Sequence, residues 1–230
     1  MRMDFDDQFF VNGKRMHAQQ AGNMGWGIFA DAHFDTGDAI IRIKIGGDEH
    51  SEILPWEQQF GPYYDYCFTF APRFVFCPKP THPFRYLNHS CNANCGFINW
   101  GILEEDTYLP VVAYKPILPN TQVYLDYPLL TCPDEGTPEG DPWTMDCLCG
   151  EPNCRKIISG FDALPKAEQL TTLQRTIKGK SGVVLAHLLD GREDLLAEFA
   201  QQSPKLFAEF TQALQAQKDY ARRLSSTRQL

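Results

Sequence analysis

The chain has 230 residues, of which 43% are hydrophobic and 13% aromatic, so it holds enough apolar side chain to bury a core and is not a disordered protein. Its formal net charge of −8 disfavours direct binding to nucleic acid phosphates and suits a basic peptide. No apolar run reaches the roughly 20 residues that span a bilayer, and acidic residues stand where a signal peptide would be basic. We therefore expect a soluble intracellular protein, cytoplasmic or nuclear, or a host-directed effector, that binds no membrane.

Short apolar segments separated by turn-forming residues fill the chain from about residue 9 to residue 160. Segments of this kind predict short strands, here AIIRIKI, YCFTF, RFVFC, LPVVAYKPI and QVYLDY. The segments NGK, DTGD and PKPTHP supply turns between them, and CPDEGTPEGDP predicts an exposed loop. The body of the protein is therefore expected to be mainly β.

The composition changes after Gly160 to Leu, Ala, Gln, Glu and Lys with helical spacing. Ser203 and Pro204 suit an N-cap and a first helical position, and they precede the apolar residues Leu206, Phe207, Phe210 and Leu214. Residues 161–230 are therefore predicted to form three or four amphipathic helices. Their apolar faces would pack onto the body or onto a second copy of the chain, which would give a homodimer.

The first segment with chemical content is GNMGWGIFA, in which Gly25 and Gly27 flank Trp26 ahead of an apolar strand. Glycine allows the backbone to approach a ligand closely, and tryptophan offers a flat apolar face. A pair of glycines alone is most often a turn, and no dinucleotide-binding glycine pattern is present. The segment therefore predicts a ligand site only in combination with others.

Two further segments collect polar groups. In RYLNHSCNANC, Arg85, Asn88 and His89 could hold a polar ligand such as an adenine edge, or could be ordinary core hydrogen-bonding residues. In TQVYLDY, Tyr127 ends an apolar strand immediately before a proline and could present its hydroxyl to a cleft, although most strand tyrosines only pack. Cys91 and His89 could also be the nucleophile and base of a thiol hydrolase. That function would leave the spacing of Cys147, Cys149 and Cys154 unexplained.

The strongest local signal is CLCGEPNC, which contains Cys147, Cys149 and Cys154 in a C-x-C-x4-C spacing. Structural zinc is held by four ligands in a tetrahedron, and this loop supplies three closely spaced thiolates. Cys91 and Cys95 are both candidates for the fourth ligand. The alternative is that these cysteines are small buried side chains, as free cysteines often are.

These elements, in this order, resemble the SET-domain family of protein lysine methyltransferases, in which G-x-G, N-H-S-C, [F/Y]-D-Y and a post-SET C-x-C-x4-C follow one another. The resemblance covers residues 22–160. It implies a SET fold of small antiparallel sheets around a pseudoknot over residues 9–160, with the post-SET motif at about 145–160 and a helical segment at 161–230. It implies one structural zinc ion bound by Cys91, Cys147, Cys149 and Cys154, which leaves Cys95 as a spare thiol.

The resemblance also assigns roles to individual residues by their place in these motifs. Tyr127 matches the catalytic tyrosine. The residues expected to line the S-adenosylmethionine pocket are Met24, Gly25, Trp26, Tyr66, Arg85, Tyr86, Asn88 and His89. The implied activity is methyl transfer to a lysine of a basic protein such as a histone, and the alternative is a SET-like module that binds peptides without catalysis.

The chain departs from the family pattern at three points. Leu125 replaces the usual Phe or Tyr two residues before the tyrosine, a position linked to how many methyl groups are added. Gln122 stands where the family most often has Glu. A cysteine-rich pre-SET segment is not evident, which removes one indication of the substrate class.

Overall fold

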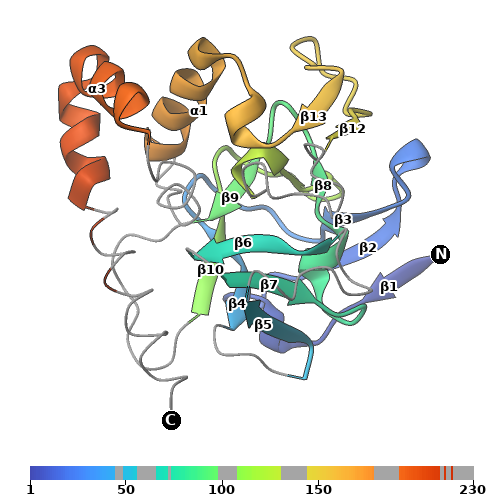
Figure 1. Cartoon of the computed structure of the whole chain (residues 1–230). Helices are drawn as coiled ribbons and strands as arrows, with labels where there is room; N and C mark the ends of the chain where they lie inside the picture. Colours follow the sequence, from blue (N-terminus) through green and yellow to red (C-terminus); the bar gives the residue numbers. More distant parts are fainter. Residues whose placement is uncertain are drawn as a thin grey trace.

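The structure is a computed structural model, and it describes residues 1–44, 49–55, 66–71, 74–97, 108–130, 144–178, 192–212, 215 and 219. In this part of the chain the strands form five small sheets (Figure 1). The three-stranded sheets are β1 (Arg2–Asp4), β2 (Met16–Gln20) and β3 (Trp26–Ala30); β4 (Ala39–Lys44), β10 (Tyr108–Ala113) and β9 (Cys95–Phe97); and β5 (Ser51–Pro55), β7 (Phe74–Pro78) and β6 (Phe68–Ala71).

Two further sheets have two strands each. β12 (Thr144–Asp146) and β13 (Ile157–Ser159) are antiparallel, whereas β8 (Asn88–His89) and β11 (Tyr124–Leu125) are parallel. Single 3-10 turns lie between the strands, namely η1 (Asp7–Phe9), η2 (Gly22–Met24), η5 (Pro83–Tyr86), η6 (Tyr127–Leu129) and η7 (Phe161–Ala163). The short sheets surround one core, and the hairpin of β12 and β13 lies at its upper edge in Figure 1.

The predicted strands are found close to their expected places. AIIRIKI forms β4, where Ile41 and Ile43 are fully buried while Arg42 and Lys44 are exposed, because successive side chains of a strand point to opposite faces. The other predicted segments contribute β6, β7, β10 and β11. The expected mainly β body with a helical C-terminal segment is confirmed. The predicted loop at residues 132–142 lies outside the described residues.

The C-terminal segment forms helices that pack on the body. α1 (Lys166–Lys178) and α3 (Glu193–Gln202) are followed by a helical segment that begins at Pro204 and is described to residue 212. Apolar side chains of this segment belong to the same core cluster as the sheets, among them Leu170, Leu173, Leu195, Phe199 and Phe210. The boundary at residue 160 and the predicted homodimer stay predictions. Within the described ranges, we find no helix with the length and apolar character of a membrane span.

The parallel pair of β8 and β11 brings two distant segments together. Tyr124 lies beside Asn88 and Leu125 beside His89, and the backbone N–H of Ser90 donates to the carbonyl of Leu125 at 2.9 Å. A parallel pair cannot be closed by a tight turn, so the chain must travel a long way between these strands. The segment that carries NHSC is thereby fixed next to the segment that carries Tyr127.

Asn94 reinforces this pairing through its side chain. Its Nδ2 donates to the carbonyl of Gln122 at 2.8 Å, and its Oδ1 accepts from the backbone N–H of Tyr124 at 2.8 Å. The Asn94 residue is buried, with 5% of its surface exposed. The amide therefore acts as one further backbone unit of the sheet and satisfies groups that β11 would otherwise leave unpaired.

We expect Asn94→Ala to lower the free energy of unfolding by about 2–6 kcal/mol, because two largely buried backbone groups lose partners at roughly 1–3 kcal/mol each. Urea denaturation followed by circular dichroism measures the change. Asn92→Ala is the matched control, since Asn92 is exposed and its side chain bonds only surface groups, Glu151 and Lys115. A loss for Asn94→Ala no larger than for the control would contradict this role.

Candidate functional site

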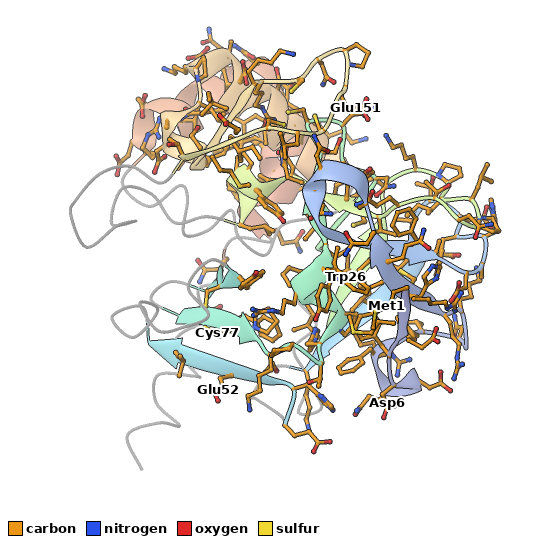
Figure 2. All side chains as sticks on the ribbon, turned by 90° about the vertical axis from the view of Figure 1, so that its right-hand side faces the viewer. Met1, Asp6, Trp26, Glu52, Cys77 and Glu151 are labelled. Atoms are coloured by element: carbon orange, nitrogen blue, oxygen red, sulfur yellow. The ribbon has the colours of Figure 1, made fainter. Side chains whose placement is uncertain are left out.

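The glycine-flanked tryptophan follows a tight turn. η2 ends at Met24, and Gly25 has φ 73° and ψ −131°, a conformation that strongly favours glycine. The turn is closed by the backbone N–H of Ala21, which donates to the carbonyl of Gly25 at 2.7 Å. Trp26 then begins β3, half-buried, and Figure 2 shows it between the loop of Glu151 and the sheet that carries Cys77.

Gly27 serves a different purpose from Gly25. A Cβ added at Gly27 would lie 2.3 Å from Nε2 of Gln122 and 2.9 Å from Cβ of Ala21. The absence of a side chain therefore makes room for the chain's own Gln122. The Nε2 of Gln122 is buried and has no hydrogen-bond partner among the described residues, while its Oε1 accepts from the hydroxyl of Tyr124 at 2.8 Å.

Asn88 joins the glycine turn to the NHSC segment. Its Nδ2 donates to the carbonyl of Trp26 at 3.0 Å, across 62 positions of sequence. The rings of Trp26 and Tyr86 lie with centroids 6.5 Å apart, and the Tyr86 hydroxyl donates to the carbonyl of Pro80 at 2.7 Å. These contacts bring three of the predicted pocket residues to one place.

Arg85 and Tyr66 form a second contact among the predicted pocket residues. The guanidinium carbon of Arg85 lies 3.4 Å from the centroid of the Tyr66 ring, and its Nη1 donates to the carbonyl of Pro78 at 3.2 Å. Stacking of this kind orients the guanidinium and the ring face to face. Tyr66 remains 43% exposed, so it lies at the rim of this group of residues.

Tyr127 is held at both its backbone and its hydroxyl. The hydroxyl donates to the carbonyl of Leu87 at 2.8 Å, and the backbone N–H donates to Nδ1 of His89 at 3.1 Å. Burial raises the pKa of Tyr127 well above its ordinary value. The phenol therefore stays protonated at neutral pH, and its oxygen keeps a lone pair that can accept a hydrogen bond from another group.

His89 points toward the cysteines. Because Nδ1 accepts from Tyr127, the proton of the neutral ring lies on Nε2, which is 3.3 Å from Sγ of Cys91. The side chain of His89 is buried between these two partners, so a contact of this residue with a cofactor would use its backbone. Cys91 is also buried, which makes it a poor nucleophile for the thiol hydrolase alternative.

Four cysteine sulfurs gather at the end of β8. The Sγ atoms of Cys91, Cys147, Cys149 and Cys154 all lie within 4.8 Å of one another, and those of Cys91 and Cys147 are 3.7 Å apart. Zinc–sulfur bonds of about 2.3 Å in a tetrahedron separate the sulfurs by about 3.8 Å. This donor set therefore fits one structural zinc ion.

Backbone hydrogen bonds favour the thiolate form in this cluster, although burial outweighs them at Cys91 and Cys147 and raises the pKa of both. The N–H of Arg155 lies 3.3 Å from Sγ of Cys91, and the N–H of Lys156 lies 3.4 Å from Sγ of Cys154. Burial opposes ionisation of Cys149, but backbone hydrogen bonds from Cys91 and Glu151 outweigh it and lower its pKa to about 7. Thiolates stabilised in this way are the ligands that zinc requires.

Cys95 lies apart from the cluster. It is buried, its thiol donates to the carbonyl of Tyr124 at 3.2 Å, and burial raises its pKa. A neutral thiol that donates its proton to a backbone carbonyl is not available as a metal ligand. Of the two candidates for the fourth position, the structure thus brings Cys91 to the other three cysteines.

Arg155, Asp126 and Asn94 are residues whose importance the sequence analysis missed. Nη1 and Nη2 of Arg155 donate to the two carboxylate oxygens of Asp126 at 2.7 and 3.1 Å, with the Asp126 side chain 1% exposed. Desolvation lowers the pKa of Arg155, but the contact with Asp126 outweighs it and raises the pKa overall. The available signal was position, since Arg155 directly follows the last cysteine and Asp126 directly precedes Tyr127.

Comparison with known proteins identifies the class. Residues 25–128 match the family model of the SET domain. The crystal structure of Arabidopsis thaliana SUVH6 in complex with SAM has a TM-score of 0.51 and 18% sequence identity, and covers 65% of this chain and 34% of that chain. Residues 25–128 therefore form a SET domain, and the likeness to this solved structure confirms the SET fold expected from the sequence.

Two curated relatives of this chain carry the name histone-lysine N-methyltransferase. The putative histone-lysine N-methyltransferase ASHH4 of Arabidopsis thaliana is 25% identical over 169 residues, which are 72% of this chain and 44% of that protein. A histone-lysine N-methyltransferase, H3 lysine-36 specific, of Aspergillus oryzae is 30% identical over 151 residues, 64% of this chain and 15% of that protein. The chain thus spans less than half the length of these relatives, and its four-cysteine cluster is post-SET-like.

Cysteine variants test the metal centre. We expect the purified protein to hold one zinc ion per chain, and we expect Cys91→Ser or Cys149→Ser to lose it, because three ligands bind far more weakly than four. Cys95→Ser is the matched control and should keep the ion. Elemental analysis of each purified variant measures the stoichiometry. Full zinc content in Cys91→Ser, or loss in Cys95→Ser alone, would show that the ligand set is wrong.

Proposed function

We propose that this protein is an S-adenosylmethionine-dependent protein-lysine N-methyltransferase that acts on a basic protein such as a histone and carries one structural zinc ion. The observation that carries the proposal is the meeting of the glycine turn, the NHSC segment and Tyr127 through the bonds of Asn88 and His89. The names of the relatives support a histone as substrate. The acidic balance of the chain also suits a basic peptide.

The residues that would hold the cofactor are those around this meeting point. Met24, Gly25 and Trp26 would offer backbone and an apolar face, and Tyr66, Arg85, Tyr86, Asn88 and His89 would complete the pocket. When bound there, S-adenosylmethionine supplies an electrophilic methyl group. The buried Nε2 of Gln122, without a partner in the described part of the chain and next to Gly27, is a polar donor at the edge of the same region and is compatible with a polar ligand nearby.

The reaction requires a neutral lysine, whereas the model lysine pKa is about 10.4. An apolar channel lowers that pKa because it removes water from the ammonium ion, so a strong base is not needed. Tyr127 cannot be that base, since burial raises its pKa and its proton is donated to Leu87. The free lone pair of its hydroxyl would instead accept an N–H of the amine and orient the attacking nitrogen, and orientation supplies much of the rate.

The zinc ion would be structural. With all four positions taken by cysteine, no ligand position remains for a substrate. Its effect would be to tie the NHSC segment to the loop after β12. A nuclear location follows from a histone substrate, and direct binding of nucleic acid is not part of the proposal.

We expect the wild-type chain to transfer radiolabelled methyl groups from S-adenosylmethionine to lysine in a histone mixture or a cell lysate. Tyr127→Phe should lower turnover by about 100-fold or more, because the nitrogen loses the group that orients it. Cofactor affinity, measured by calorimetry, should stay within about threefold, since Tyr127 is assigned to the amine and not to cofactor binding. Unchanged turnover in Tyr127→Phe would remove this role. A wild-type chain that labels no protein and does not bind the cofactor either would favour the peptide-binding alternative.

Leu125 predicts the number of methyl groups added. Its side chain is buried and aliphatic, so it cannot hold a water molecule by a hydrogen bond as a tyrosine there would. We expect di- or trimethyl-lysine as the end product, and Leu125→Tyr should shift the product toward monomethyl-lysine. Mass spectrometry of the modified peptide at long reaction times measures the ratio. Only monomethyl product from the wild type would refute this prediction.

A further inference from the structure

Asp126 and Arg155 form an ion pair between two segments to which the proposed function assigns separate roles. Asp126 directly precedes Tyr127, and Arg155 directly follows Cys154. The pair uses both carboxylate oxygens, with only 1% of the Asp126 side chain and 13% of the Arg155 side chain exposed. We propose that Arg155 is a positioning residue that couples the four-cysteine cluster to Tyr127. The inference rests on the proposed function, in which Tyr127 orients the substrate amine.

The backbone of Arg155 fixes one end of this connection. Its N–H lies 3.3 Å from Sγ of Cys91, and the neighbouring Lys156 has its carbonyl bonded to the N–H of Cys147 at 2.7 Å. When the four cysteines bind an ion, these bonds therefore fix the position of the Arg155 backbone. When the cluster is open, the loop that carries Arg155 is free of that restraint.

The side chain of Arg155 fixes the other end. A carboxylate as buried as Asp126 is stable only with a charged or hydrogen-bonded partner, and a two-bond contact with arginine sets direction as well as distance. The carbonyl of Asp126 also accepts from the N–H of Leu129 at 3.1 Å, which closes the turn that contains Tyr127. The position of Asp126 thereby determines the position of the Tyr127 backbone, from which the phenol side chain extends.

His89 supplies a second connection from the cluster to Tyr127. Its Nε2–H faces Sγ of Cys91, and its Nδ1 accepts the backbone N–H of Tyr127. The cluster is thus connected to Tyr127 in two ways. His89 bonds the backbone of Tyr127 itself, and Arg155 bonds the side chain of the preceding residue, Asp126. Two connections restrict rotation of this short segment in a way that one connection does not.

A matched ion pair elsewhere in the chain separates coupling from ordinary stabilisation. Arg192 donates to Asp162 through Nη1 at 2.6 Å, with the side chains 27% and 17% exposed, and among the described residues Arg192 has no bond to Tyr127 or to the four cysteines. Arg192→Lys removes the same planar guanidinium from an ion pair that is also partly buried, although it is joined by one bond and not two. It controls for the general effect of replacing arginine by lysine.

The experiment compares Arg155→Lys with Arg192→Lys in the full chain. Bound zinc, cofactor affinity, kcat and KM are measured for each, together with hydrogen exchange of the backbone amides of Tyr127, Leu129 and Leu130 before and after removal of zinc by a chelator. For the wild type, chelation should speed exchange at these amides. Arg155→Lys should keep one zinc ion and its cofactor affinity while kcat falls by about 100-fold, the effect of a displacement near 1 Å.

The exchange data decide the coupling independently of activity. With zinc bound, Arg155→Lys should already show the fast exchange around Tyr127 that chelation produces in the wild type, and Arg192→Lys should not. Unchanged exchange at these amides in Arg155→Lys would overturn the inference, as would a loss of kcat that only follows loss of zinc. If the wild type transfers no methyl group, the proposed function fails, and the exchange comparison still tests the coupling.

A second variant covers the case in which Arg155→Lys does not fold. Asp126→Asn combined with Arg155→Ala removes both charges, so no unpaired charge is left in the core. This double variant should fold, retain zinc and show the same fast exchange around Tyr127. Slow exchange there, equal to that of the zinc-bound wild type, would likewise overturn the inference.

Discussion

The hydrogen bonds that hold residues 88–95 against residues 122–127 determine where the candidate functional groups of this protein lie. The parallel strands β8 and β11 meet there, and Asn94 adds its amide to the pair. From this pairing Asn88 reaches the glycine turn and His89 reaches Tyr127. The strands β8 and β11 have only two residues each, so their backbone hydrogen bonds alone do little to position these groups. Side-chain hydrogen bonds therefore supply the remaining restraints.

The polar groups around Tyr127 are satisfied inside the protein rather than by water, whereas Nε2 of the nearby Gln122 has no partner among the described residues. Asp126 is paired with Arg155, and both ring nitrogens of His89 lie within hydrogen-bond distance of a partner. In surroundings of low dielectric constant, an unsatisfied donor or charge is costly, so each of these groups strongly favours its observed partner. The result is a rigid frame for Tyr127, which is what a residue that acts by orientation requires.

Much of the fold could be predicted from the sequence because the signals were local. Alternating burial along β4 and the change to helical spacing after Gly160 both depend on neighbouring residues. The three cysteines of CLCGEPNC were equally local, and their spacing alone indicated a metal. The choice between Cys91 and Cys95 depended instead on the direction of each thiol, which the spacing of NHSCNANC does not determine.

The roles that could not be predicted belong to polar residues whose partners lie far along the chain. Asn94 bonds residues 28 and 30 positions away, and Arg155 bonds Asp126 across 29 positions. Read locally, each is an ordinary polar residue of a loop. Gly27 belongs to a glycine pair that was expected to allow close approach of a ligand, whereas the nearest atom to its missing side chain belongs to Gln122. Such contacts follow from the tertiary arrangement and leave no periodic trace in the sequence.

The cysteine cluster also has a consequence for how the protein is made. Its ligands are separated by 56 positions between Cys91 and Cys147, so a chain leaving the ribosome presents the NHSC segment well before the loop that completes the cluster. Until that loop emerges, Cys91 lacks the other three cysteines and Asp126 lacks Arg155. The supply of metal at the end of synthesis, rather than the rate of synthesis itself, would then set how much of the newly made protein reaches its working conformation.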